Sequence, residues 1–159
     1  MLCAMYHRAQ DGAAVAWDGG FESGRSPSSL RASSSPKHAA IGYAFTGILP
    51  GDIQQPVQAG EGWFCLDGRV VAGKRLVGVK EATRLLEQKL NSAEFPSIQR
   101  HVDGAYSACL CVDDKLLVTR DPLGLKSTFM GRRNDLVGIA SDRKALWAIG
   151  IPEPESLPP

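Results

Sequence analysis

Four cysteines are the side chains of this sequence best suited to covalent or metal chemistry. Cys65, Cys109 and Cys111 lie within or beside apolar stretches, and Cys3 lies near the first residue. Cys109 and Cys111 are two positions apart in a segment with strand character, so both point to one face and could share a ligand. No two of the four have the Cys-x-x-Cys spacing of zinc or redox sites, which favours small, buried, reduced thiols. We therefore expect no metal site and no cofactor.

Charged residues beside glycines form a second group of candidates. His7 and Arg8 precede Asp11-Gly12, and Asp67-Gly68 has the composition of a turn. An arginine in such a place either belongs to a binding site or pairs with a carboxylate that orders the turn. For His7 and Arg8 we favour the structural turn.

The composition limits the classes of partner and compartment. The chain has 159 residues, 43% of them hydrophobic, and 18 basic against 17 acidic side chains give a net charge of +1. A near-neutral chain has no excess of positive charge that would attract nucleic acid or an anionic membrane. No apolar run reaches the roughly 18 residues of a membrane-spanning helix, and the sequence does not begin with a signal-like segment. We expect a cytoplasmic protein with no nucleic-acid and no membrane partner.

Hydrophobic periodicity places these candidates on the strands and turns of one α+β domain, residues 1–159. Apolar or alternating stretches predict strands at 12–18, 38–49, 62–71, 105–112, 115–120, 127–130 and 136–140. Apolar spacing predicts a helix over 81–90, and capping residues predict two more at about 92–101 and 141–147. Seven serines within residues 23–36 predict a mobile Ser/Pro-rich loop. This order favours two stacked antiparallel sheets with helices on their outer faces.

Several segments resemble class II glutamine amidotransferase domains. The segment 120–126, R-D-P-L-G-L-K, is similar to the family's R-D-P-x-G-x-K/R, and 140–146, A-S-D-R-K-A-L, is similar to its A-S-E-x-K-A-L. H-R-A-Q-D-G at 7–12 looks like the H-R-G-P/Q-D-G element, and the Q-P and N-G elements have counterparts at 55–56 and 67–68. The resemblance covers essentially the whole sequence, which is unusual for a chance match of short motifs.

Within that family, the sequence looks most similar to the amidotransferase half of asparagine synthetase, and next to amidophosphoribosyltransferase. The terminal Leu157-Pro158-Pro159 favours the asparagine synthetase branch. The resemblance implies an N-terminal nucleophile hydrolase fold, a four-layer αββα sandwich. It also implies that the first strand, which carries the nucleophile, is lacking from this sequence, so that a sheet edge is left unpaired.

The family's nucleophile is a cysteine at the first position, whose free α-amine serves as the base. Cys3 lies only four residues before His7, whereas the family's nucleophile lies a whole strand and more upstream of that histidine. We therefore judge Cys3 to be out of register and predict no catalytic residue in this sequence.

The family's glutamine-binding positions have also changed. Phe45 stands where the G-H-x-R element has the arginine that binds the substrate carboxylate, and Val79 stands where an aspartate binds the ammonium. Asp67 replaces the asparagine that donates to the oxyanion, while the backbone N–H of Gly68 is retained as a vestige of that element. These substitutions predict that glutamine is no longer held.

Two hypotheses follow. The first is a degenerate amidotransferase-like domain without glutaminase activity, acting as a binding, regulatory or assembly module beside a separate synthetase-type domain or within a homo-oligomer, with an unknown small-molecule ligand. The second is a glutamine-hydrolysing amidotransferase, supplying ammonia for amide synthesis, whose N-terminal cysteine strand is missing from this sequence. A missing nucleophile fits both hypotheses. The changed binding positions favour the first.

Overall fold

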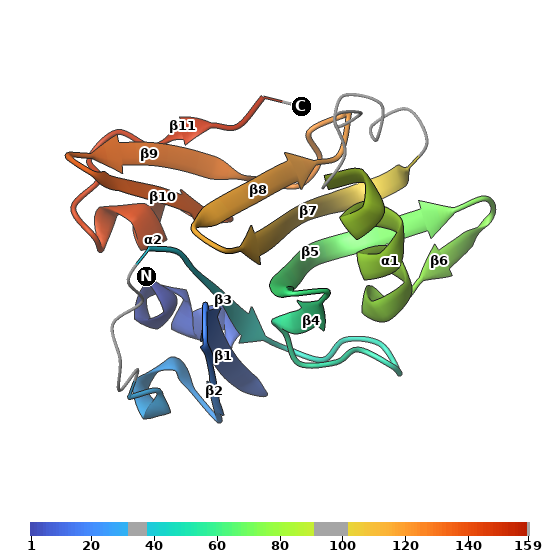
Figure 1. The fold of residues 1–159 in the computed structure, drawn as a ribbon, viewed down its shortest axis with the longest axis horizontal. Helices are drawn as coiled ribbons and strands as arrows, with labels where there is room; N and C mark the ends of the chain where they lie inside the picture. Colours follow the sequence, from blue (N-terminus) through green and yellow to red (C-terminus); the bar gives the residue numbers. More distant parts are fainter. Residues whose placement is uncertain (32–37, 91–101, 159) are drawn as a thin grey trace.

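A computed structural model describes residues 1–31, 38–90 and 102–158, and Figure 1 shows their path. Within these ranges the strands form three antiparallel sheets, with the orders β2-β1-β3, β4-β5-β7-β8 and β10-β9-β11, and β6 pairs with β5. Helix α1 (Val79–Leu90) covers one face of the five-stranded sheet, and the two smaller sheets lie toward its other face (Figure 1). The predicted α+β sandwich is therefore confirmed.

The first small sheet is built from small residues. It contains β1 (Gly12–Trp17), β2 (Gly20–Gly24) and β3 (Ala40–Phe45). Ala16 and Ile41 of this sheet pack with Cys65 and Cys111 of the five-stranded sheet in one buried cluster. Short side chains on β1 allow the two sheets to approach each other closely.

The five-stranded sheet forms the centre of the molecule. Its strands are β4 (Val57–Ala59), β5 (Gly62–Ala72), β6 (Arg75–Val77), β7 (Asp103–Val112) and β8 (Lys115–Arg120). The β7–β8 hairpin turns at Asp113, whose φ of 52° is in the left-handed region that aspartate tolerates. Gly68 has a φ of 114°, and a Cβ there would lie 2.1 Å from the carbonyl oxygen of Ala105 on the neighbouring strand. Glycine is thus required where β5 bends beside the candidate site.

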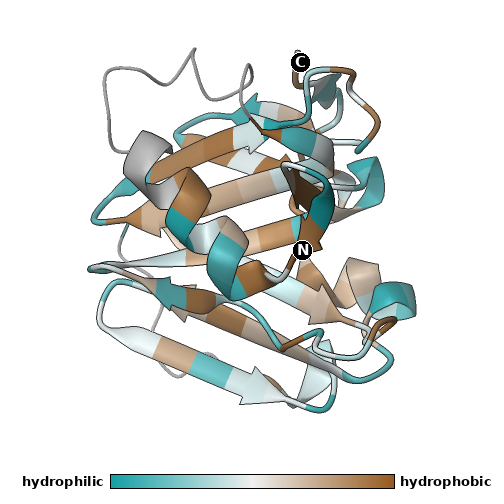
Figure 2. Cartoon of the chain, turned by 90° about the vertical axis from the view of Figure 1, so that its right-hand side faces the viewer, coloured by the Kyte–Doolittle hydropathy of each residue, from teal (hydrophilic) through white to brown (hydrophobic). Residues whose placement is uncertain are grey.

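Helix α1 packs on the sheet through one apolar face. Val79, Ala82 and Leu86 are three to four residues apart and join a cluster with Phe64 and Leu110 of the sheet. Figure 2 shows hydrophobic stretches on the strands beneath this helix. This cluster is the main core of the domain, and Val79, one of the predicted binding positions, belongs to it.

The second small sheet consists of β9 (Phe129–Arg133), β10 (Leu136–Ala140) and β11 (Glu155–Ser156). Helix α2 (Arg143–Trp147) follows β10, and the side chain of Asp142 caps it by accepting the backbone N–H of Lys144 at 3.1 Å. The 3₁₀ helix η1 (Leu2–Arg8) contacts both β3 and α2, so it bridges the two small sheets.

Some expectations from the sequence are wrong or lie outside the described residues. The loop expected at 23–36 begins inside strand β2, and Pro27–Ser29 form a short 3₁₀ helix, η2, whose Ser26 and Ser29 bond each other reciprocally. Serine hydroxyls satisfy the backbone here, which composition alone does not reveal. Residues 32–37 of that loop, and the helix expected at about 92–101, lie outside the described residues.

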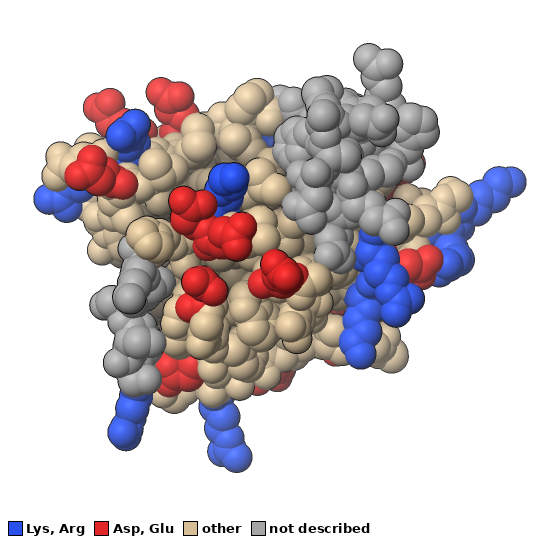
Figure 3. All heavy atoms as spheres, viewed as in Figure 1, with Lys and Arg blue, Asp and Glu red and all other residues tan. Residues whose placement is uncertain are grey.

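On the face in Figure 3, acidic side chains gather near the centre, and most lysines and arginines lie toward the edges.

In the part of the chain that the structure describes, none of the helices has the length and apolar character needed to cross a bilayer.

Candidate functional site

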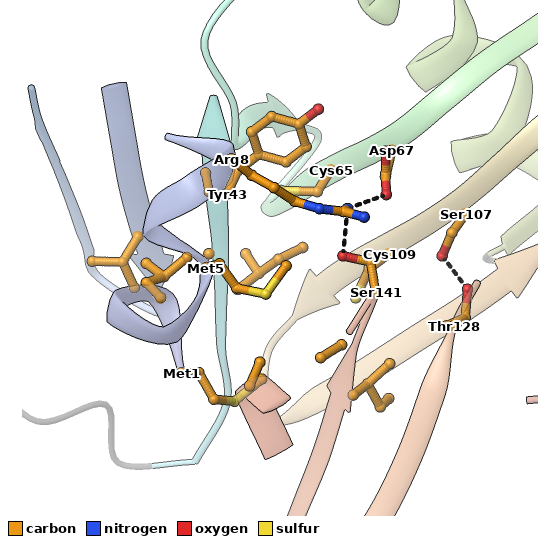
Figure 4. Close-up of a pocket in the computed structure, with 18 of the residues that line it drawn as sticks. Met1, Met5, Arg8, Tyr43, Cys65, Asp67, Ser107, Cys109, Thr128 and Ser141 are labelled. Atoms are coloured by element: carbon orange, nitrogen blue, oxygen red, sulfur yellow. Dashed lines mark hydrogen bonds and ion pairs between the residues drawn. The ribbon is translucent and has the colours of Figure 1, made fainter. Parts of the chain in front are cut away.

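A cavity of about 600 Å³ lies between the two small sheets. Residues 40–44 of β3 line it consecutively, as do residues 139–141 at the end of β10. Successive side chains of a strand point to opposite faces, so a consecutive run means that the edge of each strand faces the cavity. From β7 and β8, by contrast, only alternate residues contribute, namely Ser107, Cys109, Leu116 and Val118. The cavity is therefore a slot with the face of the five-stranded sheet as its floor and two strand edges as its walls (Figure 4).

The two walls are strand edges without a partner in the described part of the chain. β3 is the last strand of its sheet, and β10 is the last strand of the other. This agrees with the unpaired edge expected from the sequence. The structure adds that there are two such edges and that they share one cavity.

A second cavity of about 360 Å³ brings the predicted binding positions together. Phe45, Asp67, Gly68 and Val79 all line it, although they come from β3, β5 and the start of α1. The structure thus brings these four positions to one cavity. Their loss of glutamine binding stays a prediction.

Asp67 stands between the two cavities and is held by two cations. Its Oδ1 lies 2.8 Å from Nζ of Lys126, and its Oδ2 lies 3.3 Å from Nη1 of Arg8. The same Arg8 nitrogen donates to Oγ of Ser141 at 3.1 Å, so the cluster connects η1, β5 and the end of β10 (Figure 4). All three charged side chains are partly exposed. Two cations thus contact the Asp67 carboxylate at the boundary between the two cavities.

Lys126 is positioned by a buried carboxylate. Asp121 is fully buried, and its side chain accepts the backbone N–H groups of Leu125 at 2.7 Å and Lys126 at 2.9 Å. Burial by itself raises the pKa of Asp121, but these backbone bonds outweigh it and hold the pKa below its ordinary value of 3.8. Asp121 therefore remains ionised and fixes the turn that presents Lys126 to Asp67.

The second cavity contains its own ion pair. Nη2 of Arg69 lies 2.8 Å from Oδ2 of Asp52, and that same oxygen accepts the backbone N–H groups of Ile48 and Leu49 at 3.0 and 2.9 Å. The pKa of Asp52 is lowered because these bonds outweigh the effect of burial. The charges of Asp52 and Arg69 satisfy each other, so they do not replace the free arginine and aspartate that a glutamine site needs.

The thiols divide into two classes. Cys65 and Cys109 are directly opposite each other on β5 and β7 and line the floor of the slot. Burial raises the pKa of Cys109 to about 12 and holds that of Cys65 well above its ordinary value of 9.0, so neither is a thiolate at neutral pH. Cys3 is exposed on η1 and does not line the slot. Within the described residues, no cluster of three metal-ligating side chains occurs.

Three charged residues of the two cavities are not predicted from the sequence, namely Lys126, Asp52 and Arg69. Lys126 and Asp67 are 59 positions apart, as are Arg8 and Asp67, so no local pattern joins them. The sequence did predict that Arg8 pairs with a carboxylate, and the structure shows that this carboxylate is Asp67.

Comparison with known proteins addresses the fold. The chain is similar to glutamine phosphoribosylpyrophosphate amidotransferase from B. subtilis complexed with ADP and GMP, with a TM-score of 0.68 and 19% identity over 98% of this chain. It is also similar to an allosteric regulatory enzyme of purine biosynthesis, with a TM-score of 0.66 and 18% identity over 99% of this chain. This domain has an N-terminal nucleophile hydrolase fold. This chain spans 41% of each of those two chains.

Sequence similarity is more restricted. This chain is 47% identical to the chloroplastic amidophosphoribosyltransferase of Glycine max over 47 residues, which are 29% of this chain and 8% of that protein. It matches no known family profile. This sequence relative is an amidophosphoribosyltransferase, the branch that the sequence motifs placed second.

Proposed function

We propose that this chain is a class II glutamine amidotransferase-like domain that does not hydrolyse glutamine and acts as a binding module. The observation that carries the proposal is Asp67, whose carboxylate is fixed by Lys126 and Arg8 in the pocket. An anion at that place opposes the developing oxyanion, whereas a catalytic site needs a donor there.

The surroundings of Asp67 support the same conclusion. Phe45 and Val79 line the second cavity and bring no charge to it, and Arg69 is already paired with Asp52. A glutamine in this cavity would have to leave its carboxylate without a dedicated cation and its ammonium without a dedicated anion. Unpaired charges removed from water cost several kcal/mol, so the affinity for glutamine should be very weak.

The test is a glutaminase assay on the purified 159-residue chain. Ammonia release from glutamine should not exceed the uncatalysed rate, and a glutamine-mimicking chloroketone should not label Cys3. Iodoacetamide serves as the control reagent, because it should alkylate the exposed Cys3 without requiring a glutamine site. Turnover of glutamine, or chloroketone labelling of Cys3 that glutamine suppresses, would refute the proposal.

A second candidate function is favoured by the slot. Two unpaired strand edges over an apolar floor suit a central strand, and the family resemblance places a cysteine-bearing strand there. In this alternative, a form of the protein that carries such a strand hydrolyses glutamine to supply ammonia for amide synthesis. The two functions differ in one measurable respect: fusion of a Met-Cys-Gly strand restores turnover only under the second.

The finer relationships stay predictions. The lean toward asparagine synthetase rests on Leu157-Pro158-Pro159, and the relatives found are of the other branch. A separate synthetase-type partner and a homo-oligomer are both compatible with a binding module. A cytoplasmic location likewise stays a prediction.

A further inference from the structure

The smaller cavity, of about 360 Å³, has a mainly apolar lining that includes two aromatic rings. Tyr43 and Phe45 are two positions apart on β3, so their side chains leave the same face of that strand about 7 Å apart. Both line the cavity, whereas Ala44 between them does not. Four aliphatic side chains complete the apolar part of the lining: Ile48, Leu49, Ile53 and Val79.

The backbone at Gly68 gives the cavity a place for a flat ligand. Gly68 lines the cavity without a side chain, and a Cβ there would lie 2.1 Å from the carbonyl oxygen of Ala105, another lining residue. A ligand can therefore approach the backbone of β5 more closely here than at any residue with a side chain. A planar ring uses this space and also packs well against the aromatic side chains of β3.

The charged groups that line the cavity cancel one another. They are two carboxylates, Asp52 and Asp67, and two cations, Arg69 and Lys126. Each carboxylate lies 2.8 Å from one of the two cations. A ligand with a net charge must either break one of these pairs or remain without a partner of opposite charge, and both cost free energy. The cavity therefore favours a neutral ligand.

The hydroxyl of Tyr43 supplies a hydrogen-bond donor. Within the described part of the chain, it has no hydrogen-bond partner. Burial, and after it the nearby carboxylate of Asp67, raise the pKa of Tyr43 well above its ordinary value of 10.0, so the hydroxyl stays protonated. A protonated phenol can donate to a carbonyl oxygen of the ligand.

We infer that the smaller cavity binds a neutral, planar ring compound that carries a carbonyl oxygen, with Tyr43 as its hydrogen-bond donor. The inference rests on the binding role proposed above and deepens it by naming the class of ligand. The two can fail separately. Hydrolysis of glutamine would refute the proposed function, whereas failure to bind a ring compound would refute this inference alone.

The probe is benzamide, titrated into the ¹⁵N-labelled 159-residue chain and followed by the chemical shifts of the backbone amides. Saturable shifts should occur in residues 43–53 and 67–69, and residues 20–24 of the outer strand β2 should not change. Benzoate has the same ring with a negative charge and should bind at least about tenfold more weakly, because the cations are already paired. Cyclohexanecarboxamide keeps the amide without the flat ring and should bind at least about threefold more weakly.

Two matched pairs of variants test the location. Phe45→Leu should weaken benzamide binding at least about threefold, whereas Phe21→Leu removes a half-exposed ring that lines neither cavity and should have no effect. Tyr43→Phe removes only the hydroxyl and should weaken binding about two- to tenfold. Tyr6→Phe makes the same change on exposed η1 and should leave binding unchanged.

Four results would overturn the inference. They are the absence of saturable shifts with benzamide, shifts confined to residues outside the cavity, binding of benzoate or cyclohexanecarboxamide as tight as that of benzamide, and full binding by the Tyr43→Phe variant. If Phe45→Leu fails to fold, the comparison of the three compounds on the unaltered chain still decides the question.

Discussion

Restoring glutamine hydrolysis should require changes inside the pocket as well as a nucleophile. The starting protein is this chain with a Met-Cys-Gly strand fused ahead of Met1, and the changes are Asp67→Asn and Phe45→Arg. The strand supplies the thiol and α-amine, the asparagine supplies the oxyanion donor, and the arginine supplies the anchor for the substrate carboxylate. We expect the strand alone to give no measurable turnover and the triple change to give it.

The magnitudes follow from the position of Asp67. A carboxylate about 4 Å from an oxyanion repels it by about 4 kcal/mol at an effective dielectric constant near 20. Lys126 and Arg8, 2.8 and 3.3 Å from the carboxylate, offset part of this repulsion. A neutral donor at such a place is worth about 2.7–4 kcal/mol, so Asp67→Asn should raise kcat about 100- to 1,000-fold. Phe45→Arg should act on KM, lowering it at least about thirtyfold, because a charged anchor contributes about 2–5 kcal/mol.

The assay is steady-state ammonia release by the fused chain with each change alone and in combination. Asp114→Asn, on the exposed β7–β8 turn, is the control for a carboxylate-to-amide change outside the pocket. Phe45→Lys tests whether charge alone suffices or whether the forked guanidinium is needed. If the fused strand alone restores full turnover, then Phe45, Asp67 and Val79 are not disabling, and the reasoning from the pocket is wrong.

Three further predictions concern the scaffold of the site. Gly68→Ala should lower the free energy of unfolding by more than about 3 kcal/mol in denaturant titrations, since its Cβ would meet backbone; Gly73→Ala, with positive φ but open space, should cost about 1 kcal/mol. Gln55→Leu should cost about 2–4 kcal/mol, because the buried amide bonds both backbone groups of Leu66, at 2.6 and 3.0 Å. The lowered pKa of Asp121 adds stability above about pH 4 that is lost as the pH falls through that pKa. In thermal melts at a series of pH values, Asp121→Asn should reduce the fall in melting temperature between about pH 4 and lower pH. An unchanged fall in melting temperature would contradict this prediction.

The parts of the fold that sequence predicted well are those with strong local signals. The long strands β5 and β7, the β7–β8 hairpin and helix α1 all follow from apolar periodicity and turn residues. The short strands β2, β4, β6 and β11 were missed because two to five residues carry too little periodicity, and their pairing partners define them instead. The serine-rich segment was misjudged for the related reason that η2 is held by side-chain bonds of Ser26 and Ser29.

The candidate site divides in the same way. The resemblance placed Phe45, Asp67, Gly68 and Val79 in one pocket because motif positions map onto fixed places in a fold. It gave no indication of how Asp67 is neutralised, since its partners lie 59 residues before and after it. The partners of a side chain depend on three-dimensional packing, which a local sequence pattern does not encode.

Asp67 and Lys126 form a common wall, since both side chains line the slot and the smaller cavity. Any occupant of one cavity that draws Lys126 away from Asp67 changes the charge presented to the other. Ligands of the two cavities would then be linked, and the linkage would be reciprocal: each ligand would change the affinity for the other by the same factor. A single partly exposed ion pair, Lys126 with Asp67, is therefore the point at which occupancy of one cavity can change binding in the other.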